Sequence, residues 1–486
     1  EGRLDEAVLD EAVERVLNVV FAGEEQHRPE DISDKETDHK KAADIETECA
    51  VLLENNGILP LNTDRKVAYI GEFAEKPRYQ GGGSSHINPF RVVSALDAAG
   101  EKGRSVTYAK GFSNENDSMT EQELEKALRT AAEADVAVIF AGLPEIFESE
   151  GYDRTSMKLP KCQDRLIEEV LKVQPNVVVV LHNGSPVELP WADRVSAILE
   201  MYLGGQGVGE ACDRLLFGEA NPSGRLSETF PYRLEDNPSF LHFPGNGKRV
   251  LYGEDIFVGY RYYDTKKVPV RYAFGHGLSY TEFTYGDLTL SSAQMTDEDI
   301  LTVSLKVKNS GKTEGKEVVQ LYVADLCGIS ERPVKELKGF AKVHLLPGEE
   351  KTVSMEISAR NLSYYEERLG DWYAPSGTYR ILIGHASDDI RLHADVVFET
   401  KKKLPLRVDF TTTFGELLDH TKTAPVITEL LAPLAAAAAS AEGMSDEYKK
   451  LGEQVIREMP LKSLLGQMPG EQVEQLIGQL NCLLAQ

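Results

Sequence analysis

Five short apolar runs, interleaved with stretches of helical spacing, constrain the fold of this chain more than any other feature. The runs are Val67–Ile70, Val106–Ala109, Val136–Ala141, Val177–Leu181 and Ala197–Tyr202. The helical stretches are Val92–Ala99, Glu121–Ala132, Gln163–Val173 and Gly207–Phe217. Strands that alternate with helices of this length predict βαβ units and a parallel sheet. Because the runs are continuously apolar, we expect both faces of that sheet to be covered.

The pattern changes on both sides of this region. Residues 39–55 have helical spacing up to the turn signal Asn56-Gly57. Residues 221–285 are rich in Gly, Pro and aromatic side chains and are expected to form a linker. A β-sandwich is predicted next, with strands at Leu301–Val307, Val318–Ala324, Lys351–Ile357, Thr378–Ile383 and Ile390–Phe398. The end of the chain is predicted to be helical, over Glu416–Leu418, Val426–Ala441, Asp446–Glu458 and Gly470–Leu484.

Composition disfavours several classes of partner. The formal net charge is −26, whereas nucleic acids and anionic membranes need a basic patch, so neither is expected to bind. No apolar run approaches the roughly 20 residues that span a bilayer. The five cysteines are widely spaced without a CxxC pair, which disfavours a zinc site or disulfide framework and favours the cytoplasm over secretion. The chain begins inside an amphipathic helix, Glu1–Phe21, which is typical of a fragment or a processed product.

The segment Phe147-Glu148-Ser149-Glu150-Gly151-Tyr152-Asp153-Arg154 carries the most chemistry. It follows the strand predicted at Val136–Ala141, and loops at the carboxyl ends of parallel strands form the ligand crevice. A glutamate in such a loop acts as a general acid if its surroundings raise its pKa. An acidic surface loop is the alternative, and these eight residues alone do not decide between the two.

A second loop, Tyr79–His86, follows the first predicted strand and contains Gly81-Gly82-Gly83. Glycines permit close backbone approach, and a loop that shapes a pocket around a neutral ligand is favoured. A phosphate loop is disfavoured because no Lys-Ser or Lys-Thr follows. His182 is interpreted as a hydrogen-bonded structural residue, and Trp191 as core rather than a sugar platform. No Ser, His and Asp set stands at triad-like spacing.

Several motifs resemble those of glycoside hydrolase family 3 enzymes of the β-glucosidase type. They are Ala50–Leu61, Gln80–His86, Glu150–Arg154, Asn221–Leu226, Tyr272–Tyr280, Gly370–Tyr373 and Ser376–Tyr379. The resemblance covers nearly the whole chain, in order. It implies an α/β sandwich domain followed by an all-β fibronectin type III-like sandwich and a helical C-terminal tail. The implied divisions are the end of a barrel domain with a linker helix (1–38), the α/β sandwich with the acid/base loop (39–220), the linker (221–285), the fibronectin-like domain (286–400) and the helical extension (401–486).

The resemblance also implies roles for individual residues. The family's acid/base glutamate matches Glu150, with Glu148 as the fallback. Ser84, Ser85 and Phe147 would contact substrate, and Asp153 and Arg154 would support the loop. Burial against Phe147 and a neighbouring barrel is expected to raise the pKa of Glu150. No metal or other cofactor is implied.

The implied activity is one part of a retaining, exo-acting β-glycosidase that removes terminal β-linked sugars. The family's (β/α)8 barrel, with its nucleophilic aspartate in a Ser-Asp-Trp context, has no match here, although Glu1–Phe21 resembles the last helix of that barrel. Expected partners are therefore a β-linked glucoside or oligosaccharide and the barrel itself, with a homo-oligomer as a further option. The alternative is a noncatalytic carbohydrate-binding or scaffold fragment. The missing nucleophile favours that alternative, whereas Glu150 and the intact glycine loop disfavour it.

Overall fold

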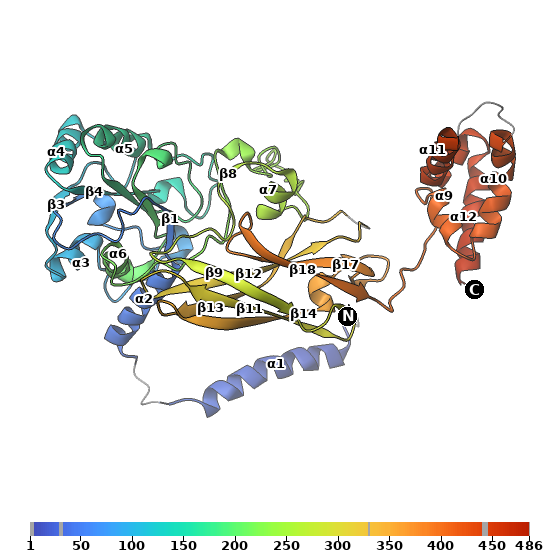
Figure 1. Ribbon diagram of the computed structural model, residues 1–486, viewed down its shortest axis with the longest axis horizontal. Coiled ribbons are helices and arrows are strands. Elements are labelled where there is room, and N and C mark those ends of the chain that lie inside the picture. The colour runs from blue at the N-terminus through green and yellow to red at the C-terminus, as the bar shows by residue number, and fades with distance from the viewer. Residues whose placement is uncertain (1–3, 29–32, 329–330, 440–445, 486) are drawn as a thin grey trace. The chain divides into compact units, whose positions relative to one another are not determined.

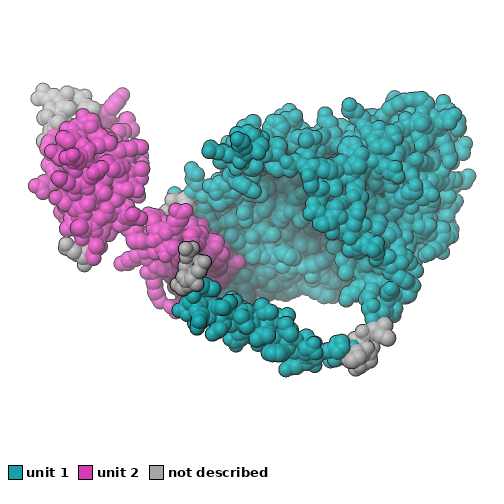
Figure 2. Space-filling model, turned by 180° about the vertical axis from the view of Figure 1, so that it is seen from behind, with its two compact units in different colours: residues 1–295, 300–357, 377–397 teal, residues 296–299, 358–376, 398–486 magenta. Residues whose placement is uncertain are grey.

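The computed structural model describes residues 4–28, 33–328, 331–439 and 446–485 (Figure 1). Their contacts divide the chain into two compact units, coloured separately in Figure 2. Unit 1 comprises residues 1–295, 300–357 and 377–397, and unit 2 comprises residues 296–299, 358–376 and 398–486. Unit 1 therefore holds both the α/β region and most of the β-sandwich.

A six-stranded sheet forms the centre of the α/β region, in the order β1-β6-β5-β4-β2-β3. The strands are β1 Val51–Asn55, β2 Val67–Ile70, β3 Val106–Ala109, β4 Val136–Gly142, β5 Val177–His182 and β6 Ala197–Glu200. All neighbouring strands are parallel except β1, which pairs antiparallel with β6. Every residue of β2, β4, β5 and β6 is buried. The parallel sheet predicted from continuous apolar runs is thus confirmed.

The helices that accompany these strands are α3 Ala95–Glu101, α4 Glu121–Ala132, α5 Lys161–Val173 and α6 Val208–Leu216. Capping boxes start two of them, formed by Ser94 with Asp97 in α3 and by Thr120 with Glu123 in α4. Each box satisfies amide groups that the first turn of a helix leaves unpaired. The four predicted helices are confirmed, with shifts of up to three residues at their ends.

The prediction of a single helical stretch over residues 39–55 is wrong at its C-terminal end. Helix α2 spans Lys35–Cys49, and the backbone becomes extended at Ala50 and continues as β1. Val51, Leu52 and Leu53 are fully buried, and β1 pairs with β6 from Val51 opposite Glu200 onward. Pairing and burial outweigh a weak local preference for helix, which is the usual outcome for a short apolar segment.

Residues 221–285 contain more structure than the predicted linker. Short strands β7 (Phe230–Pro231) and β8 (Val270–Tyr272) pair antiparallel, and α7 spans Tyr260–Lys266. The Tyr260 ring stacks on Phe274 with 4.6 Å between ring centroids, and its hydroxyl accepts a 2.7 Å hydrogen bond from the Leu337 amide. This segment is therefore packed against the β-sandwich rather than free.

The β-sandwich consists of two antiparallel sheets, in the orders β10-β18-β17-β12-β13 and β14-β11-β9. Its strands are β9 Phe283–Leu290, β10 Gln294–Thr296, β11 Ile300–Asn309, β12 Gly315–Asp325, β13 Glu336–Leu345, β14 Glu350–Ser358, β17 Gly377–Gly384 and β18 Ile390–Glu399. The five predicted strands are confirmed. Strand β13 was not predicted because only Leu345 of its ten residues is buried, so its sequence lacks a clear apolar alternation.

Unit 2 contains a hairpin and the C-terminal helices. The hairpin pairs β15 (Tyr364–Glu366) with β16 (Asp371–Tyr373) and follows α8 (Ala359–Leu362). The helices are α9 Phe414–Asp419, α10 Ala424–Ala439, α11 Asp446–Glu458 and α12 Gly470–Ala485. Their shared core includes Phe414, Leu417, Ile427, Leu461, Val473 and Leu480. The predicted helical tail is confirmed, although the predicted helix end at Ala441 lies outside the described residues.

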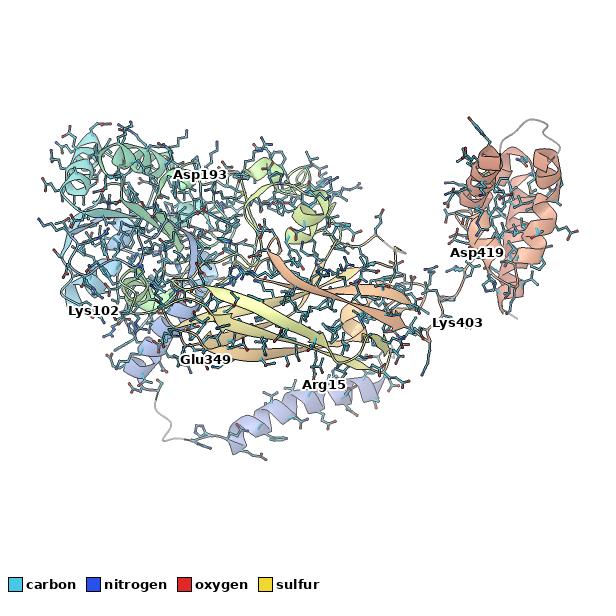
Figure 3. The ribbon with its side chains drawn as sticks, in the orientation of Figure 1. Arg15, Lys102, Asp193, Glu349, Lys403 and Asp419 are labelled. Carbon is cyan, nitrogen blue, oxygen red and sulfur yellow. The ribbon has the colours of Figure 1, made fainter. Side chains whose placement is uncertain are left out.

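The predicted N-terminal amphipathic helix is present as α1, Glu6–Glu25, and the first three residues lie outside the described part of the chain. None of its residues is buried, and the apolar side chains of Val8, Val16 and Phe21 are more than half exposed. No helix within the described residues is long and apolar enough to cross a membrane. Charged side chains such as Lys102, Asp193 and Asp419 are exposed to solvent (Figure 3).

Glu46 of α2 carries a carboxyl group that the fold holds away from water. The residue is 6% exposed, and its Oε1 atom has no hydrogen-bond partner among the described residues. Burial raises the pKa of Glu46 to about 8. The folded chain therefore keeps a proton that the unfolded chain releases near its usual pKa, which is about 4.3 for an exposed glutamate. This contribution to stability is complete below that pH and is lost as pH rises to about 8.

We expect Glu46→Gln to remove the loss of folding stability that the wild-type chain shows as pH rises. The free energy of unfolding of the wild-type chain should fall relative to the variant by about 1.4 kcal/mol per pH unit between those two pKa values. Urea unfolding at several pH values in that window measures the difference. Glu125→Gln, on the exposed face of α4, is the control and should follow the wild-type curve. Parallel curves for Glu46→Gln and the wild type would contradict the prediction.

Candidate active site

The strand order of the parallel sheet reverses at β2 and β4. The chain passes from β2 to β3 on one side and then crosses back to β4 on the other side. Open α/β sheets bind ligands at such a reversal, outside the carboxyl ends of the strands. The loops that follow β2 and β4, residues 71–86 and 143–154, flank this position.

The glycine loop lies directly against the loop after β4. A Cβ atom on Gly82 would lie 2.7 Å from Cγ of Glu145, and a Cβ on Gly83 would lie 2.7 Å from Cβ of Glu150. Gly83 also has φ +82°, in the left-handed region that side chains other than glycine rarely adopt. The glycines therefore allow two loops from neighbouring strands to touch, as expected of a loop that shapes a pocket.

Glu150 is exposed at this contact. Its Oε2 atom accepts a 2.7 Å hydrogen bond from the backbone amide of Ser84. Hydrogen bonding from the side chain and backbone of Ser84 holds the pKa of Glu150 below its usual value. The expected burial against Phe147 is not found in this chain, because Phe147 packs on the apolar core of the α/β region. The carboxylate form of Glu150 is thus the favoured one here.

Glu148, two residues earlier, has different surroundings. Its Oε2 atom accepts hydrogen bonds from Arg78 Nη1 at 2.7 Å and from the Gly184 amide at 2.8 Å. Its Oε1 atom accepts a hydrogen bond from the Ser185 hydroxyl. The Glu148 side chain is 18% exposed, so its carboxylate faces the protein rather than the crevice.

The remaining predicted site residues lie in or beside the same loops. Ser84 and Ser85 are exposed in the short turn of 3-10 helix next to Glu150, and the Ser85 hydroxyl donates to the Gly82 carbonyl at 3.3 Å. Arg154 donates to the Ser185 hydroxyl at 2.6 Å and to the Ser156 carbonyl at 2.8 Å. Asp153 is exposed. Substrate contacts of Ser84, Ser85 and Phe147, and loop support by Asp153, stay predictions.

Sequence reasoning missed Arg78, Gly184 and Ser185. These residues carry no motif of their own, and Arg78 is 70 positions from Glu148, so only the fold brings them together. His182 is buried between Phe73 and Phe140, and burial lowers its pKa to about 4. Neither of its ring nitrogens has a hydrogen-bond partner among the described residues, which corrects the prediction of a hydrogen-bonded histidine. Trp191 is fully buried, as predicted for a core residue.

An open pocket of about 550 Å³ adjoins the Glu150 loop. Its walls include Phe73 and Lys76 after β2, Asn114 after β3, and Glu145, Ser149 and Tyr152 after β4. Arg78 and Glu115 line it as well, so aromatic, polar and charged groups face one space, as in sites for small polar ligands. No group of three or more His, Cys, Asp or Glu side chains in the described ranges is placed to hold a metal ion.

The contact between Gly83 and Glu150 can be tested directly. We expect Gly83→Ala to displace Glu150 and to break its hydrogen bond with Ser84, because the new Cβ would lie 2.8 Å from Oε2. The pKa of Glu150 should then rise toward its usual value, which carboxyl ¹³C NMR measures. The control is Gly57→Ala, since Gly57 also has a positive φ, +100°, but no atom within 4 Å of an added Cβ. An unchanged Glu150 titration in Gly83→Ala would refute this geometry.

Comparison with known families gives two matches. Residues 50–280 match the family described as Glycosyl hydrolase family 3 C-terminal domain, and residues 317–387 match the Fibronectin type III-like domain. Thermostable beta-glucosidase B of Acetivibrio thermocellus is 45% identical over 99% of this chain. Exo-alpha-(1->6)-L-arabinopyranosidase of Bifidobacterium breve is 37% identical over the whole chain. In both cases the chain spans 64% of the relative's length.

A solved structure shows the same architecture. The GH3 beta-glucosidase of Bifidobacterium adolescentis superposes with a TM-score of 0.81 and 37% identity. The superposition covers 88% of this chain and 63% of that one. Both predicted domain types, the α/β domain and the fibronectin-like domain, are therefore supported by sequence as well as by fold.

Proposed function

Because the chain belongs to glycosyl hydrolase family 3, we propose that it supplies the general acid/base of a retaining, exo-acting β-glucosidase. The observation that carries the proposal is Glu150, an exposed carboxylate oriented by the Ser84 amide at the crevice between β2 and β4. The nucleophile would come from a (β/α)8 barrel that is not among these 486 residues. In a retaining enzyme the two carboxyl groups stand about 5 Å apart, so the barrel would have to cover Glu150.

In the first step, the barrel carboxylate would attack the anomeric carbon while the glycosidic C–O bond breaks. Glu150 would donate its proton to the departing oxygen, leaving a glycosyl-enzyme ester on the barrel. In the second step, the Glu150 carboxylate would take a proton from water, whose oxygen attacks the anomeric carbon and releases the nucleophile. Each proton that Glu150 gives in the first step is recovered in the second.

The surroundings of Glu150 suit the second step without further change. Hydrogen bonding from Ser84 favours the carboxylate, which is the form that removes a proton from water. The first step needs the protonated form. A covering barrel would favour it, because a second carboxylate nearby and the exclusion of water both raise the pKa of a glutamate.

The substrate class is proposed from the relatives and tested together with the activity. Two named activities occur among them, β-glucosidase and exo-α-(1→6)-L-arabinopyranosidase. We favour a β-glucoside, because the relative with 45% identity is a β-glucosidase. The pocket beside Glu150 offers aromatic and polar groups that suit a sugar or an aryl leaving group.

The experiment joins the chain to a barrel. The 486-residue chain alone should not hydrolyse 4-nitrophenyl β-glucoside, whereas a fusion with the part of the A. thermocellus relative that this chain does not cover, where we expect the barrel, should. The first product should be the β-anomer of glucose, seen by ¹H NMR before mutarotation. A parallel assay with 4-nitrophenyl α-L-arabinopyranoside decides the sugar. A folded fusion that binds these glycosides without hydrolysing either would favour a noncatalytic carbohydrate-binding chain instead.

A further inference from the structure

We infer that Glu148 is a positioning residue that fixes the place of Glu150 without exchanging a proton with substrate. The inference rests on the proposed function of Glu150. It assigns different tasks to the two glutamates of one loop, which the sequence alone leaves interchangeable.

Glu148 joins loops from the carboxyl ends of three adjacent strands. Arg78 comes from the loop after β2, Glu148 from the loop after β4, and Gly184 with Ser185 from the segment after β5. Arg78 also donates to the carbonyls of Leu143 at 3.0 Å and of Glu148 at 2.8 Å. The backbone between residues 143 and 148 is therefore held at both ends by one guanidinium group.

The contacts of Glu148 with Arg78, Arg154, Gly184 and Ser185 are called the Glu148 lock. The balance of charge in this lock depends on the Glu148 carboxylate. The side chains of Arg78 and Arg154 are 7% and 19% exposed, and both form ion pairs with Glu148, at 2.7 Å and 3.7 Å. Without that carboxylate, two guanidinium groups of like charge would remain in a poorly hydrated place. Both Glu148 oxygens are occupied by donors from the protein, so neither is turned toward a leaving group.

The lock and Glu150 are connected through the same pair of loops. Arg78 donates a hydrogen bond to Glu148. Six residues later in the same loop, the Ser84 amide donates one to Glu150. Gly82 and Gly83 keep the two loops in contact between these points, since neither could carry a Cβ without displacing Glu145, Ser149 or Glu150. Releasing Glu148 would therefore free the second contact as well.

The test uses the chain itself and needs no catalysis. In Glu148→Gln we expect carboxyl ¹³C NMR to show the Glu150 pKa returning upward, toward the usual glutamate value of about 4.3. The Ser84 amide should exchange its hydrogen faster. Glu150→Gln identifies the Glu150 signal, because that carboxyl resonance disappears from the spectrum. An unchanged Glu150 titration with an unchanged Ser84 amide in Glu148→Gln would overturn the inference.

Two further variants guard against misfolding and nonspecific effects. Ser185→Ala removes one donor from Glu148 and leaves Arg78 in place, so a smaller shift in the same direction is expected. If Glu148→Gln does not fold, an unchanged Glu150 titration in Ser185→Ala overturns the inference. Glu121→Gln removes the exposed Glu121–Arg165 ion pair, 2.9 Å long, and should change neither signal.

The fusion with a barrel separates this inference from the proposed function. There, Glu148→Gln should lower kcat more for poor than for good leaving groups, but by smaller factors than Glu150→Gln, because the displaced acid/base is still present. If the wild-type fusion is folded but inactive, the proposed function fails, while the NMR result still decides whether Glu148 positions Glu150. If Glu148→Gln slows poor leaving groups as much as Glu150→Gln does while the Glu150 titration is unchanged, the inference is overturned although the enzyme is a glycosidase.

Discussion

Glu150→Gln in the barrel fusion is expected to lower kcat by about 10²- to 10⁴-fold for aryl β-glucosides with poor leaving groups. Glutamine keeps the size of the side chain and can still accept the hydrogen bond from Ser84, but it cannot donate a proton to the departing oxygen. Activated glucosides such as 2,4-dinitrophenyl β-glucoside leave without that proton, so their first step should slow much less. Stopped-flow release of the phenols measures this step for each substrate.

Two outcomes of this experiment would argue against Glu150 as the acid/base. Equal slowing of good and poor leaving groups would indicate a displaced site rather than a lost proton donor. Full activity would place the acid/base elsewhere, with Glu148 as the first residue to examine. Glu125→Gln in α4, an exposed glutamate outside both loops, is the matched control for loss of one negative charge.

The fold was predictable where local sequence and burial agree. Strands β2, β4, β5 and β6 are buried at every residue because both faces of the sheet are covered, and their nearly continuous apolar sequences therefore predict them directly. Strand β1 was not predicted, since its five residues follow a helix and become a strand only through pairing with β6. Strand β13 was not predicted because only one of its ten residues is buried, so its sequence shows no apolar alternation.

The candidate site was predictable where its residues are neighbours in the sequence, but not where the fold brings distant residues together. Glu150 and the glycine loop each belong to a motif that is continuous in the sequence. The partner that orients Glu150 is a backbone amide, which leaves no trace in residue type. Arg78 and Ser185 meet Glu148 only because β2, β4 and β5 are neighbours, and strand order is a property of the folded sheet.

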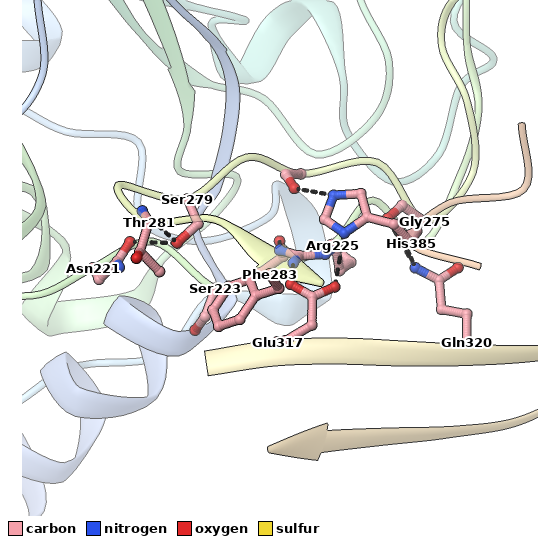
Figure 4. A network of polar contacts seen from close by, with 12 residues as sticks. Asn221, Ser223, Arg225, Gly275, Ser279, Thr281, Phe283, Glu317, Gln320 and His385 are labelled. Carbon is pink, nitrogen blue, oxygen red and sulfur yellow. Dashed lines mark hydrogen bonds and ion pairs between the residues drawn. The ribbon is translucent and has the colours of Figure 1, made fainter. Parts of the chain in front are cut away.

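A buried polar network joins the segment after α6 to the β-sandwich within unit 1 (Figure 4). At its centre, Glu317 of β12 is fully buried and accepts hydrogen bonds from Arg225 Nη2 at 2.8 Å and Tyr285 hydroxyl at 2.6 Å. His385 Nδ1 lies 2.7 Å from the same carboxylate. Burial alone would raise the pKa of Glu317, but the hydrogen bond with His385 and the charge of Arg225 hold it below its usual value.

Glu317→Ala is therefore expected to destabilise unit 1 by about 3 to 5 kcal/mol, the usual loss when one partner of a buried ion pair is removed. The variant would leave the Arg225 guanidinium, which is 6% exposed, without its carboxylate partner. It would also leave the Tyr285 hydroxyl without its hydrogen-bond acceptor. Urea unfolding at neutral pH measures the change. The control is Glu350→Ala, whose carboxylate is 45% exposed and pairs with Lys306 at 3.4 Å, and it should cost less than about 1 kcal/mol.

Because the pKa of Glu317 is depressed, its stabilisation is present above the usual glutamate pKa and is lost as pH falls through the lower, folded value. The difference between Glu317→Ala and the wild type should therefore shrink in acid, and a loss as small as that of Glu350→Ala at neutral pH would show that the network does not stabilise unit 1.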